Sequence, residues 1–318
     1  MRQAVVDVFV DACRRTITER LRAEQQIVGG LHFVAELLNK PHEFQKVRDL
    51  MADRHSVSVL DWLLNFRTAH YLTGSKDAAE KLFPPIITRR EHDDMMRRMS
   101  SLPEAELEGN VDFDLIENFI LDGYTLPGVC EVEEGDTVIN LGSFNGSTDI
   151  VFARMAGETG HVHAFEPNPA MHGIIRRNLE KTGLSNRVSV IPMAVSERPG
   201  TLRFATNMGA ASQIMANGDV EVPVITLDQW VQQAGIERVD FLKLDIEGHE
   251  IPALRGAAQT IVRHRPKLAI SVYHYHNDVN GITLLIHELS PWYEFYLRHN
   301  AMWDSEVVLF GRPIKRLG

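Results

Sequence analysis

The sequence predicts an α/β fold in which a mostly parallel sheet follows a helical N-terminal region. In the first part of the chain, segments such as "VSVLDWLLNFRTAHYL" place apolar residues at three- and four-residue steps, which is the helical period. From about residue 126 onward, short apolar runs alternate with helical patterns, and this alternation indicates βαβ units. We therefore expect two parts, a helical region over residues 1–125 and an α/β domain over residues 126–318.

Five apolar runs predict the parallel strands: "DTVINLG", "GHVHAFEP", "RVSVIPMAV", "DFLKLDIEG" and "KLAISVYH". Helical segments such as "AMHGIIRRNLEKTG" and "ALRGAAQTIVRHR" lie between them, as a sheet covered on both faces requires. Near the C-terminus, "WYEFYLRHN" and "SEVVLFG" are close enough in sequence to form an antiparallel pair at one edge. The Gly-, Ser- and Asn-rich segment 207–219 is expected to be an exposed, mobile loop.

Composition excludes several classes of protein. A formal net charge of −10 disfavours a nucleic-acid partner, which would call for a basic surface. Two distant cysteines, Cys13 and Cys130, disfavour a disulfide framework and a cysteine-based zinc site. The N-terminal apolar patch is interrupted by Asp7 and Asp11, so it predicts neither a signal peptide nor a membrane span. We expect a cytoplasmic protein with no nucleic-acid or membrane partner.

The segment "VINLGSFNGST" predicts a ligand-binding loop. It ends the first expected strand and precedes a helix, and Gly142 and Gly146 there would let the backbone approach a ligand closely. Twenty residues after Gly146, Glu166 ends the second strand, where a carboxylate can accept both hydroxyl hydrogens of a ribose. Together these features indicate a nucleoside-containing cofactor. The G-x-x-x-G spacing differs from G-x-G-x-x-G, which weakens an NAD interpretation.

An ordered set of motifs resembles the FkbM-type methyltransferases: "GSFNGST", "AFEPNP", "MAVSERPG", "TLDQW", "FLKLDIEGHE", "RPKLAISVYHYHND" and "YLRHN…SEVVLF". The resemblance covers about residues 128 to 312, with a weaker similarity in "LMADRHSVSVLDWLLNFRTAHYLTG". It implies a Rossmann-like class I methyltransferase sheet. It also implies S-adenosylmethionine as the cofactor and O-methylation of a sugar or natural product.

By position, the resemblance implies that Gly142 and Gly146 face the methionine end of the cofactor and that Glu166 binds its ribose. Met193 and Ala194 would lie near the adenine, although a plain buried strand end explains these two residues equally well. The predicted cofactor-binding set is Asn140, Gly142, Ser143, Asn145, Gly146, Glu166, Met193 and Ala194.

Asn140 departs from the resembling family, whose members usually carry Asp at this position. An acid would offset the positive sulfonium and ammonium of the cofactor, whereas an amide can hydrogen-bond but supplies no charge. The departure predicts weaker cofactor binding, and it is the specific feature that supports a non-catalytic protein.

Polar residues at the ends of the fourth and fifth strands predict the catalytic site. Asp245 follows the fourth strand and His274 follows the fifth, and an imidazole of near-neutral pKa is a suitable general base for removing a hydroxyl proton. We therefore predict His274 as the base, with Asp245 assisting. Asp245, His274 and Asp278 could also surround Mg²⁺ or a similar ion, although this set is not diagnostic. The alternative for each is a hydrogen-bonded residue at the rim, and Glu247 is undecided.

The sequence as a whole predicts an S-adenosylmethionine-dependent O-methyltransferase that acts on a small-molecule or glycoside acceptor. The helical region would form a lid, a substrate contact or a homodimer contact. Two alternatives stay open at this point: a non-catalytic protein that keeps the methyltransferase fold, and, less favoured, an NAD-dependent oxidoreductase.

Overall fold

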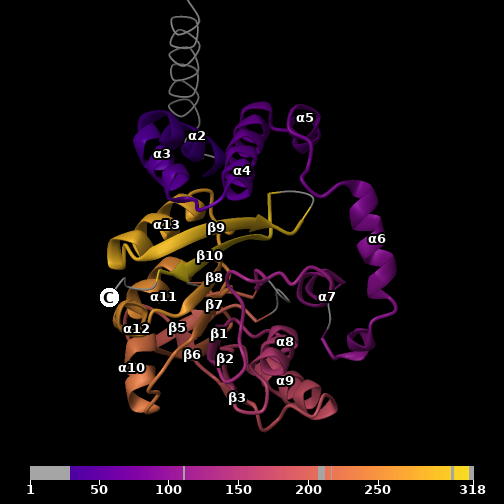
Figure 1. Ribbon diagram of the computed structural model, residues 1–318, viewed down its shortest axis with the longest axis vertical. Helices are drawn as coiled ribbons and strands as arrows, with labels where there is room; N and C mark the ends of the chain where they lie inside the picture. The colour runs from indigo at the N-terminus through magenta and orange to yellow at the C-terminus, as the bar shows by residue number, and fades with distance from the viewer. Residues whose placement is uncertain (1–28, 110–111, 207–211, 216, 302–303, 315–318) are drawn as a thin grey trace, which may run out of the picture.

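The computed structural model describes residues 29–109, 112–206, 212–215, 217–301 and 304–314. Its first part is helical, as expected from the sequence. The helices are α2 (Gly29–Asn39), α3 (Pro41–Leu50), α4 (Arg54–Thr73), α5 (Lys76–Leu82), α6 (Arg89–Met99) and α7 (Asp112–Phe119), with a 3₁₀ turn over Pro103–Glu106. Figure 1 shows α2–α5 gathered at one end of the molecule, while α6 runs down its side and α7 lies between α6 and the sheet. The described residues do not include the N-terminal apolar patch, Cys13 or residues 207–211 of the expected loop.

Local signals set the ends of the longest helix, α4. Asp53 caps its N-terminus by accepting a hydrogen bond from the Ser56 backbone nitrogen at 2.6 Å, and Gly74 ends it in a left-handed conformation with φ 68°. The same cap joins the helix to the sheet, because Arg298 donates to the Asp53 carboxylate at 2.8 Å and Leu297 N donates to Ser56 Oγ at 2.9 Å. The helical region is therefore bonded directly to the α/β domain.

Arg67 makes a second connection between the two parts. Its guanidinium, in α4, is 1 % exposed and donates to the carbonyl oxygens of His276 at 3.0 Å and Asp304 at 3.3 Å. The Asp304 carboxylate lies 3.5 Å from Arg67 Nε. These contacts anchor α4 to two loops that are more than 200 residues away in sequence.

We expect Arg67→Met to lower the free energy of unfolding by about 2–3 kcal/mol, because it removes the buried guanidinium that bonds the His276 and Asp304 carbonyl groups and pairs with the Asp304 carboxylate. Arg48→Met is the matched control. The Arg48–Asp61 ion pair is about 44 % exposed, so this change should lower the free energy of unfolding far less than Arg67→Met does. Urea denaturation of both variants checks the difference. Equal losses would show that the buried contacts of Arg67 do not hold the two parts together.

The α/β domain is built on a seven-stranded sheet of order β3-β2-β1-β7-β8-β10-β9. Its strands are β1 (Thr137–Leu141), β2 (His161–Phe165), β3 (Val188–Ile191), β7 (Phe241–Leu244), β8 (Lys267–Ser271), β9 (Tyr293–His299) and β10 (Val307–Pro313). The first five are parallel, and β10 runs opposite to both of its neighbours. The predicted parallel strands and the antiparallel C-terminal edge pair are confirmed.

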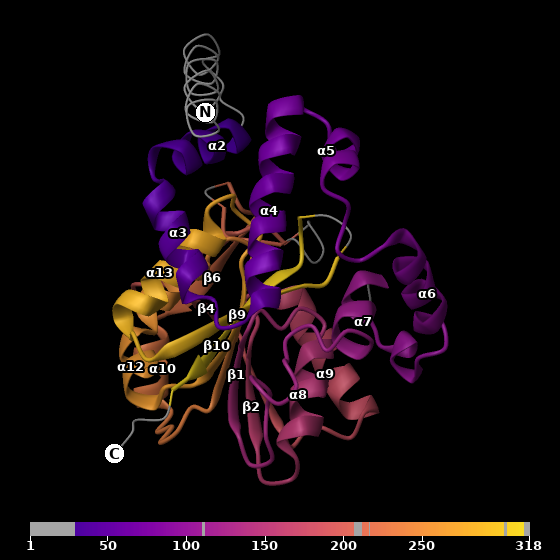
Figure 2. The ribbon, with the colours of Figure 1, turned by 45° about the horizontal axis from the view of Figure 1, so that its top comes forward.

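Helices cover both faces of this sheet (Figure 2). One face packs against α8 (Ser147–Ala156) and α9 (Pro169–Lys181), and the other packs against α10 (Leu227–Gln233), α11 (Glu250–Gly256), α12 (Ala258–His264), α13 (Asp278–Leu289) and α4. Successive side chains of β1 point to opposite faces of the sheet. Val138 packs in the core beneath α8 and α9, whereas Ile139 and Leu141 pack in the core on the opposite face. Asn140 consequently lies on the α8 side.

A smaller sheet of order β4-β6-β5 was not expected from the sequence. It contains β4 (Ala194–Val195), β5 (Gly200–Phe204) and β6 (Val220–Ile225). The segment between β5 and β6 was predicted to be an exposed loop. Asn217 and Asp219 are exposed, but residues 212–215 are half-buried. Ala205 N donates to Gln213 O and Met215 N donates to Arg203 O, so this segment follows β5. The polar composition of this segment indicated an exposed loop, but its backbone hydrogen bonds with β5 and the residue after it bury part of the segment.

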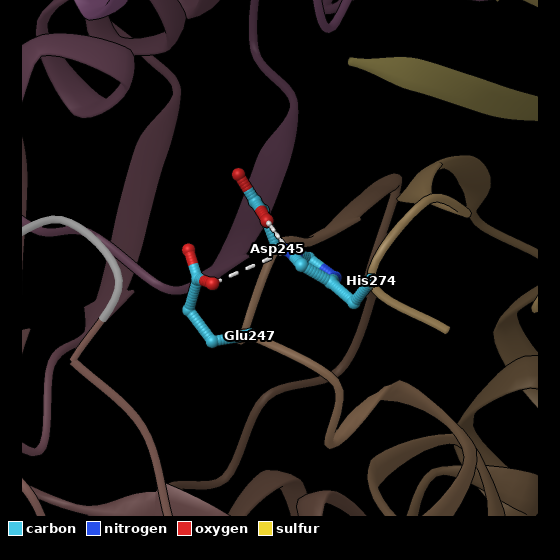
Figure 3. Close-up of side chains that lie close together, drawn as sticks. All are labelled: Asp245, Glu247 and His274. Atoms are coloured by element: carbon cyan, nitrogen blue, oxygen red, sulfur yellow. Dashed lines mark ion pairs between the residues drawn. The ribbon is translucent and has the colours of Figure 1, made fainter. Parts of the chain in front are cut away.

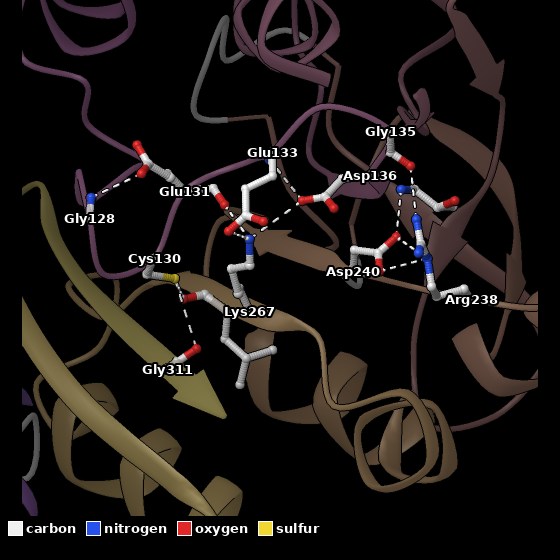
Figure 4. A network of polar contacts seen from close by, with 12 residues as sticks. Gly128, Cys130, Glu131, Glu133, Gly135, Asp136, Arg238, Asp240, Lys267 and Gly311 are labelled. Atoms are coloured by element: carbon white, nitrogen blue, oxygen red, sulfur yellow. Dashed lines mark hydrogen bonds and ion pairs between the residues drawn. The ribbon is translucent and has the colours of Figure 1, made fainter. Parts of the chain in front are cut away.

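Ion pairs fasten the segment before β1 at the edge where the parallel strands begin (Figure 4). Lys267 Nζ donates to the Glu131 carbonyl and to the Glu133 carboxylate, both at 2.8 Å, and Arg238 pairs with Asp240. The buried Cys130 thiol donates to Leu268 O at 3.3 Å, and burial raises its pKa to about 12. These groups are engaged in structural contacts.

Within the described part of the chain, no helix combines the length and apolar character that crossing a membrane requires.

Candidate active site

A pocket of about 420 Å³ lies where β1, β2, β7 and β8 end, the place where ligands bind in open parallel sheets. Phe204 of β5 closes one side, together with Ser212 and Ile214 from the segment that follows β5. The segment that contains α7 contributes Asp114, Glu117 and Tyr124. Both the N-terminal region and the α/β domain therefore form this pocket.

The loop after β1 forms the floor, and Gly142 is required there. Its φ is 91°, and a Cβ at this position would lie 1.8 Å from the Asp245 carbonyl oxygen. Gly146 also has a positive φ, but it begins α8 and packs against Ile175 of α9. The two glycines thus serve different purposes: Gly142 lines the pocket, whereas Gly146 permits the turn into the helix.

Asn140 lies beneath the floor and does not line the pocket. Its side chain is fully buried, and Nδ2 donates to Asp149 Oδ1 at 2.7 Å. Ser143 Oγ donates to the other oxygen of the same carboxylate. Burial raises the pKa of Asp149, against the lowering effect of these two hydrogen bonds. An acid is therefore present under the loop, but it comes from α8, nine residues after the position where it was expected.

Glu166 lies at the end of β2 as predicted and lines the pocket. Its carboxylate accepts from Phe144 N at 2.7 Å and from Asn168 N at 2.8 Å, so the first loop holds it in place. Burial raises its pKa to about 7. Each carboxylate oxygen still has a free lone pair, so Glu166 can accept further hydrogen bonds from a vicinal diol.

The pocket contains five of the eight residues predicted to bind a cofactor: Gly142, Ser143, Glu166, Met193 and Ala194. The other three do not line it. Asn140 and Gly146 support the loop as described, and Asn145 is buried, where its side chain donates to Asp114 and accepts from Ser147 N. Alternation along β1 and the turn geometry direct the Asn140 and Asn145 side chains away from the cavity.

His274 lies between three carboxylates, two of which are shown in Figure 3. Nε2 is 3.3 Å from Asp245 and 3.6 Å from Glu247, and Nδ1 is 3.1 Å from Glu250. Burial lowers the pKa of this imidazole, but the three acids outweigh burial and raise it to about 10. His274 is therefore a cation at neutral pH. It does not line the pocket, whereas Asp245 and Glu247 do.

The charge of His274 should make folding stability depend on pH. The folded pKa is about 10 and the ordinary value is 6.5, so the stabilisation is complete below pH 6.5 and is lost as the pH rises through about 10. We expect the difference in unfolding free energy between wild type and His274→Gln to shrink across this interval. Urea denaturation at both ends of the interval measures it. A constant difference would mean that His274 stabilises the fold without its charge.

The structure does not bring the predicted metal set of Asp245, His274 and Asp278 together. Asp278 begins α13, and its carboxylate accepts from Tyr275 N at 2.6 Å. Within the described residues, His274 belongs to two groups with metal-ligand spacing, one with Asp245 and Glu247 and the other with Glu250 and Asp278. Since a metal-bound imidazole must be unprotonated, either group would have to release the proton that its carboxylates stabilise.

Several pocket residues escaped the sequence analysis. Lys243 is buried inside β7, donates to Gly142 O at 2.7 Å and lies over the Tyr124 ring at 4.7 Å. A lysine in the otherwise apolar run "FLKL" is a signal that could have identified it. Tyr124, whose hydroxyl donates to Asp245 at 2.5 Å, and Glu117 and Glu306 carry no such local signal.

The part of the chain that forms this site matches a known protein family. Residues 140–299 match the model of the Methyltransferase FkbM domain, which covers the glycine loop, Glu166 and the Asp245–His274 cluster. The chain belongs to the FkbM methyltransferase family. The resemblance in the sequence motifs is thereby confirmed.

Two curated relatives of this FkbM-family chain are methyltransferases by name. Hexuronic acid methyltransferase AglP from Haloferax volcanii is 26 % identical over 163 residues, which cover 50 % of this chain and 64 % of that protein. 2-O-methyltransferase NoeI from Sinorhizobium fredii is 24 % identical over 156 residues, 42 % of this chain and 63 % of that protein. The chain thus spans less than two thirds of either relative.

The fold has a counterpart among solved structures. Methyltransferase FkbM from Methylobacillus flagellatus superimposes with a TM-score of 0.61 at 20 % identity, covering 91 % of this chain and 63 % of that one. This similarity confirms the Rossmann-like methyltransferase fold.

Proposed function

We propose that this protein transfers a methyl group from S-adenosylmethionine to a hydroxyl group on a sugar or natural-product scaffold. The observation that carries the proposal is that the glycine loop, Glu166 and the carboxylates after β7 converge in one pocket. Membership of the FkbM family and the names of the two relatives support the reaction type.

The lining residues suit the proposed donor. Gly142 and Ser143 would hold its amino-acid portion, Glu166 its ribose, and the half-buried Met193 with Ala194 its adenine. Asp114, whose carboxylate accepts from Ser147 and Asn145, also lines this pocket and would supply negative charge that Asn140 does not. When bound, S-adenosylmethionine supplies a methyl group on a positively charged sulfur.

Glu247 is the residue that we propose as the general base, in place of His274. A base must reach the acceptor hydroxyl and have a pKa near the working pH. Glu247 lines the pocket, and burial together with Asp245 raises its pKa to about 7. His274 is already protonated, so it would instead hold Asp245 and Glu247 in position.

Asp245 is less suited to accept the proton. Burial disfavours its charge, but Lys243, His274 and the Tyr124 hydroxyl outweigh burial and lower its pKa. We propose that Asp245 orients the acceptor hydroxyl and keeps Tyr124 in place.

Calorimetry with S-adenosylhomocysteine and with NADH tests the proposed function. We expect saturable binding of S-adenosylhomocysteine and no binding of NADH. Gly142→Ala should abolish the binding of S-adenosylhomocysteine, because the alanine Cβ would collide with the Asp245 carbonyl oxygen. Preferential NADH binding would favour an oxidoreductase. If neither ligand bound, a non-catalytic protein would be the better interpretation.

A further inference from the structure

The part of the pocket beyond the glycine loop is rich in carboxyl groups that come from separate elements. Glu117 comes from α7, Asp245 and Glu247 follow β7, and Glu306 precedes β10. We call Glu117, Asp245, Glu247 and Glu306 the acidic wall. Tyr124 and Tyr273 lie in the same part of the lining.

Two members of the acidic wall, Glu117 and Glu306, are buried in surroundings that disfavour their negative charge. Glu117 is 5 % exposed, lines the pocket, and has one carboxyl oxygen, Oε1, without a hydrogen-bond partner. Burial raises its pKa well above the ordinary value, and Glu306, Asp245 and Asp114 raise it further. For Glu306, burial and Asp245 raise the pKa to about 8. A buried acceptor without a donor destabilises the fold by about 1–3 kcal/mol. A ligand that donated a hydrogen bond to Glu117 would therefore gain binding free energy here.

Positive charge in the lining is scarce. Of the described lining residues, six are acids, one is the lysine Lys243, and one is the histidine His249. Lys243 points its ammonium at the Gly142 carbonyl, and burial lowers the pKa of His249, which bonds Ser196. The His274 cation contacts Asp245, Glu247 and Glu250. Lys243 lowers the pKa of Glu117 and His274 lowers that of Glu306, but burial and the neighbouring acids outweigh both effects.

We propose that the acidic wall binds a protonated amine on the methyl acceptor, through Glu117 and Glu306. An ammonium provides three donors and a positive charge, both of which a carboxylate accepts well. Lys243 already lies over the Tyr124 ring, so the carboxyl groups rather than this ring would hold the ligand. A single metal ion matches less well, since neither Glu117 nor Glu306 belongs to a described group with metal-ligand spacing. An acceptor with a carboxylate, such as a hexuronic acid, would meet repulsion. The inference rests on the proposed function and names its substrate class.

Binding of three matched sugars to the protein saturated with S-adenosylhomocysteine tests this inference. The probes are methyl glucosaminide, methyl N-acetylglucosaminide and methyl glucuronide, which present an ammonium, a neutral amide and a carboxylate. We expect the ammonium form to bind at least about tenfold more tightly than either of the others, which corresponds to one well-placed buried charge contact. Equal binding, tighter binding of the glucuronide, or no binding of any probe would overturn the inference.

Two substitutions assign the selectivity. Glu117→Gln and Glu306→Gln keep the size of the side chain, so both should fold, but neither amide can carry the negative charge that would face the ammonium. Each should remove most of the amine preference while S-adenosylhomocysteine affinity is retained. Glu158→Gln is the control, because it removes the same charge from an exposed residue between α8 and β2. A preference that survived both substitutions would refute the assignment.

Two further measurements separate this inference from its alternatives. Titration with MgCl₂ alone, and the probe series repeated with EDTA, identify a metal site. Saturable Mg²⁺ binding that Glu117→Gln abolishes, with loss of the amine preference in EDTA, would overturn the proposal in favour of a metal. Failure of S-adenosylhomocysteine to bind would instead overturn the proposed function, and the inference with it.

Discussion

Glu247→Gln should lower kcat for methyl transfer by about 10²–10⁴-fold, the contribution typical of a general base. The amide keeps the size of the side chain but cannot take the hydroxyl proton. In the wild type, kcat should rise as the pH passes through about 7, where Glu247 loses its proton, and this rise should be absent from the residual activity of the variant. Single-turnover assays with the acceptor identified by binding measure both quantities.

His274→Gln is the informative comparison for this prediction. If His274 only positions the carboxylates, its loss should reduce kcat less than Glu247→Gln and should shift the pH profile to a different midpoint. Unchanged turnover in Glu247→Gln, combined with complete loss in His274→Gln, would restore His274 as the base. Binding of S-adenosylhomocysteine by both variants shows that the donor site is intact.

Asn140→Asp should destabilise this protein, although the resembling family usually carries Asp at that position. The Asn140 amide and the Asp149 carboxylate are both fully buried and 2.7 Å apart. Two carboxyl groups at that distance cannot both ionise without a large cost. We expect a loss of about 3–5 kcal/mol in the free energy of unfolding at neutral pH, the range for an uncompensated buried charge.

The pH dependence and a double variant test the cause of that loss. A carboxyl pair has a raised pKa in the folded state, so the penalty should be small below about pH 4 and should grow as the pH rises. Asn140→Asp with Asp149→Asn restores one donor and one acceptor, and should recover most of the stability. Urea denaturation without ligand measures each variant. A stable single variant would show that Asp149 does not depend on the Asn140 amide.

The cofactor side of the pocket was largely predictable from the sequence. Gly142, Ser143 and Glu166 were identified because the carboxyl ends of parallel strands meet at one edge of a sheet, so residues that follow each strand become neighbours. The prediction for Asn140 was incomplete for a local reason. Its place on the α8 face follows from alternation along β1, but its partner Asp149 depends on how α8 packs.

The acceptor side was not predictable in the same way. Tyr124 and Asp245 are joined by a hydrogen bond across 121 residues of sequence, and Glu117 and Glu306 lie still farther apart in the chain. No periodicity or spacing connects such positions. The small β4-β6-β5 sheet was missed because its two longer strands flank a polar segment that looked like a loop.

Taken alone, the sequence determined the βαβ order, the edge pair, the glycine loop and the family, since each depends on local patterns of apolar residues, glycines and motifs. Tertiary structure decided the protonation of His274, the partner of Asn140 and the composition of the acidic wall. The physical reason is that burial and nearby charge set these properties, and both arise only when distant segments pack together.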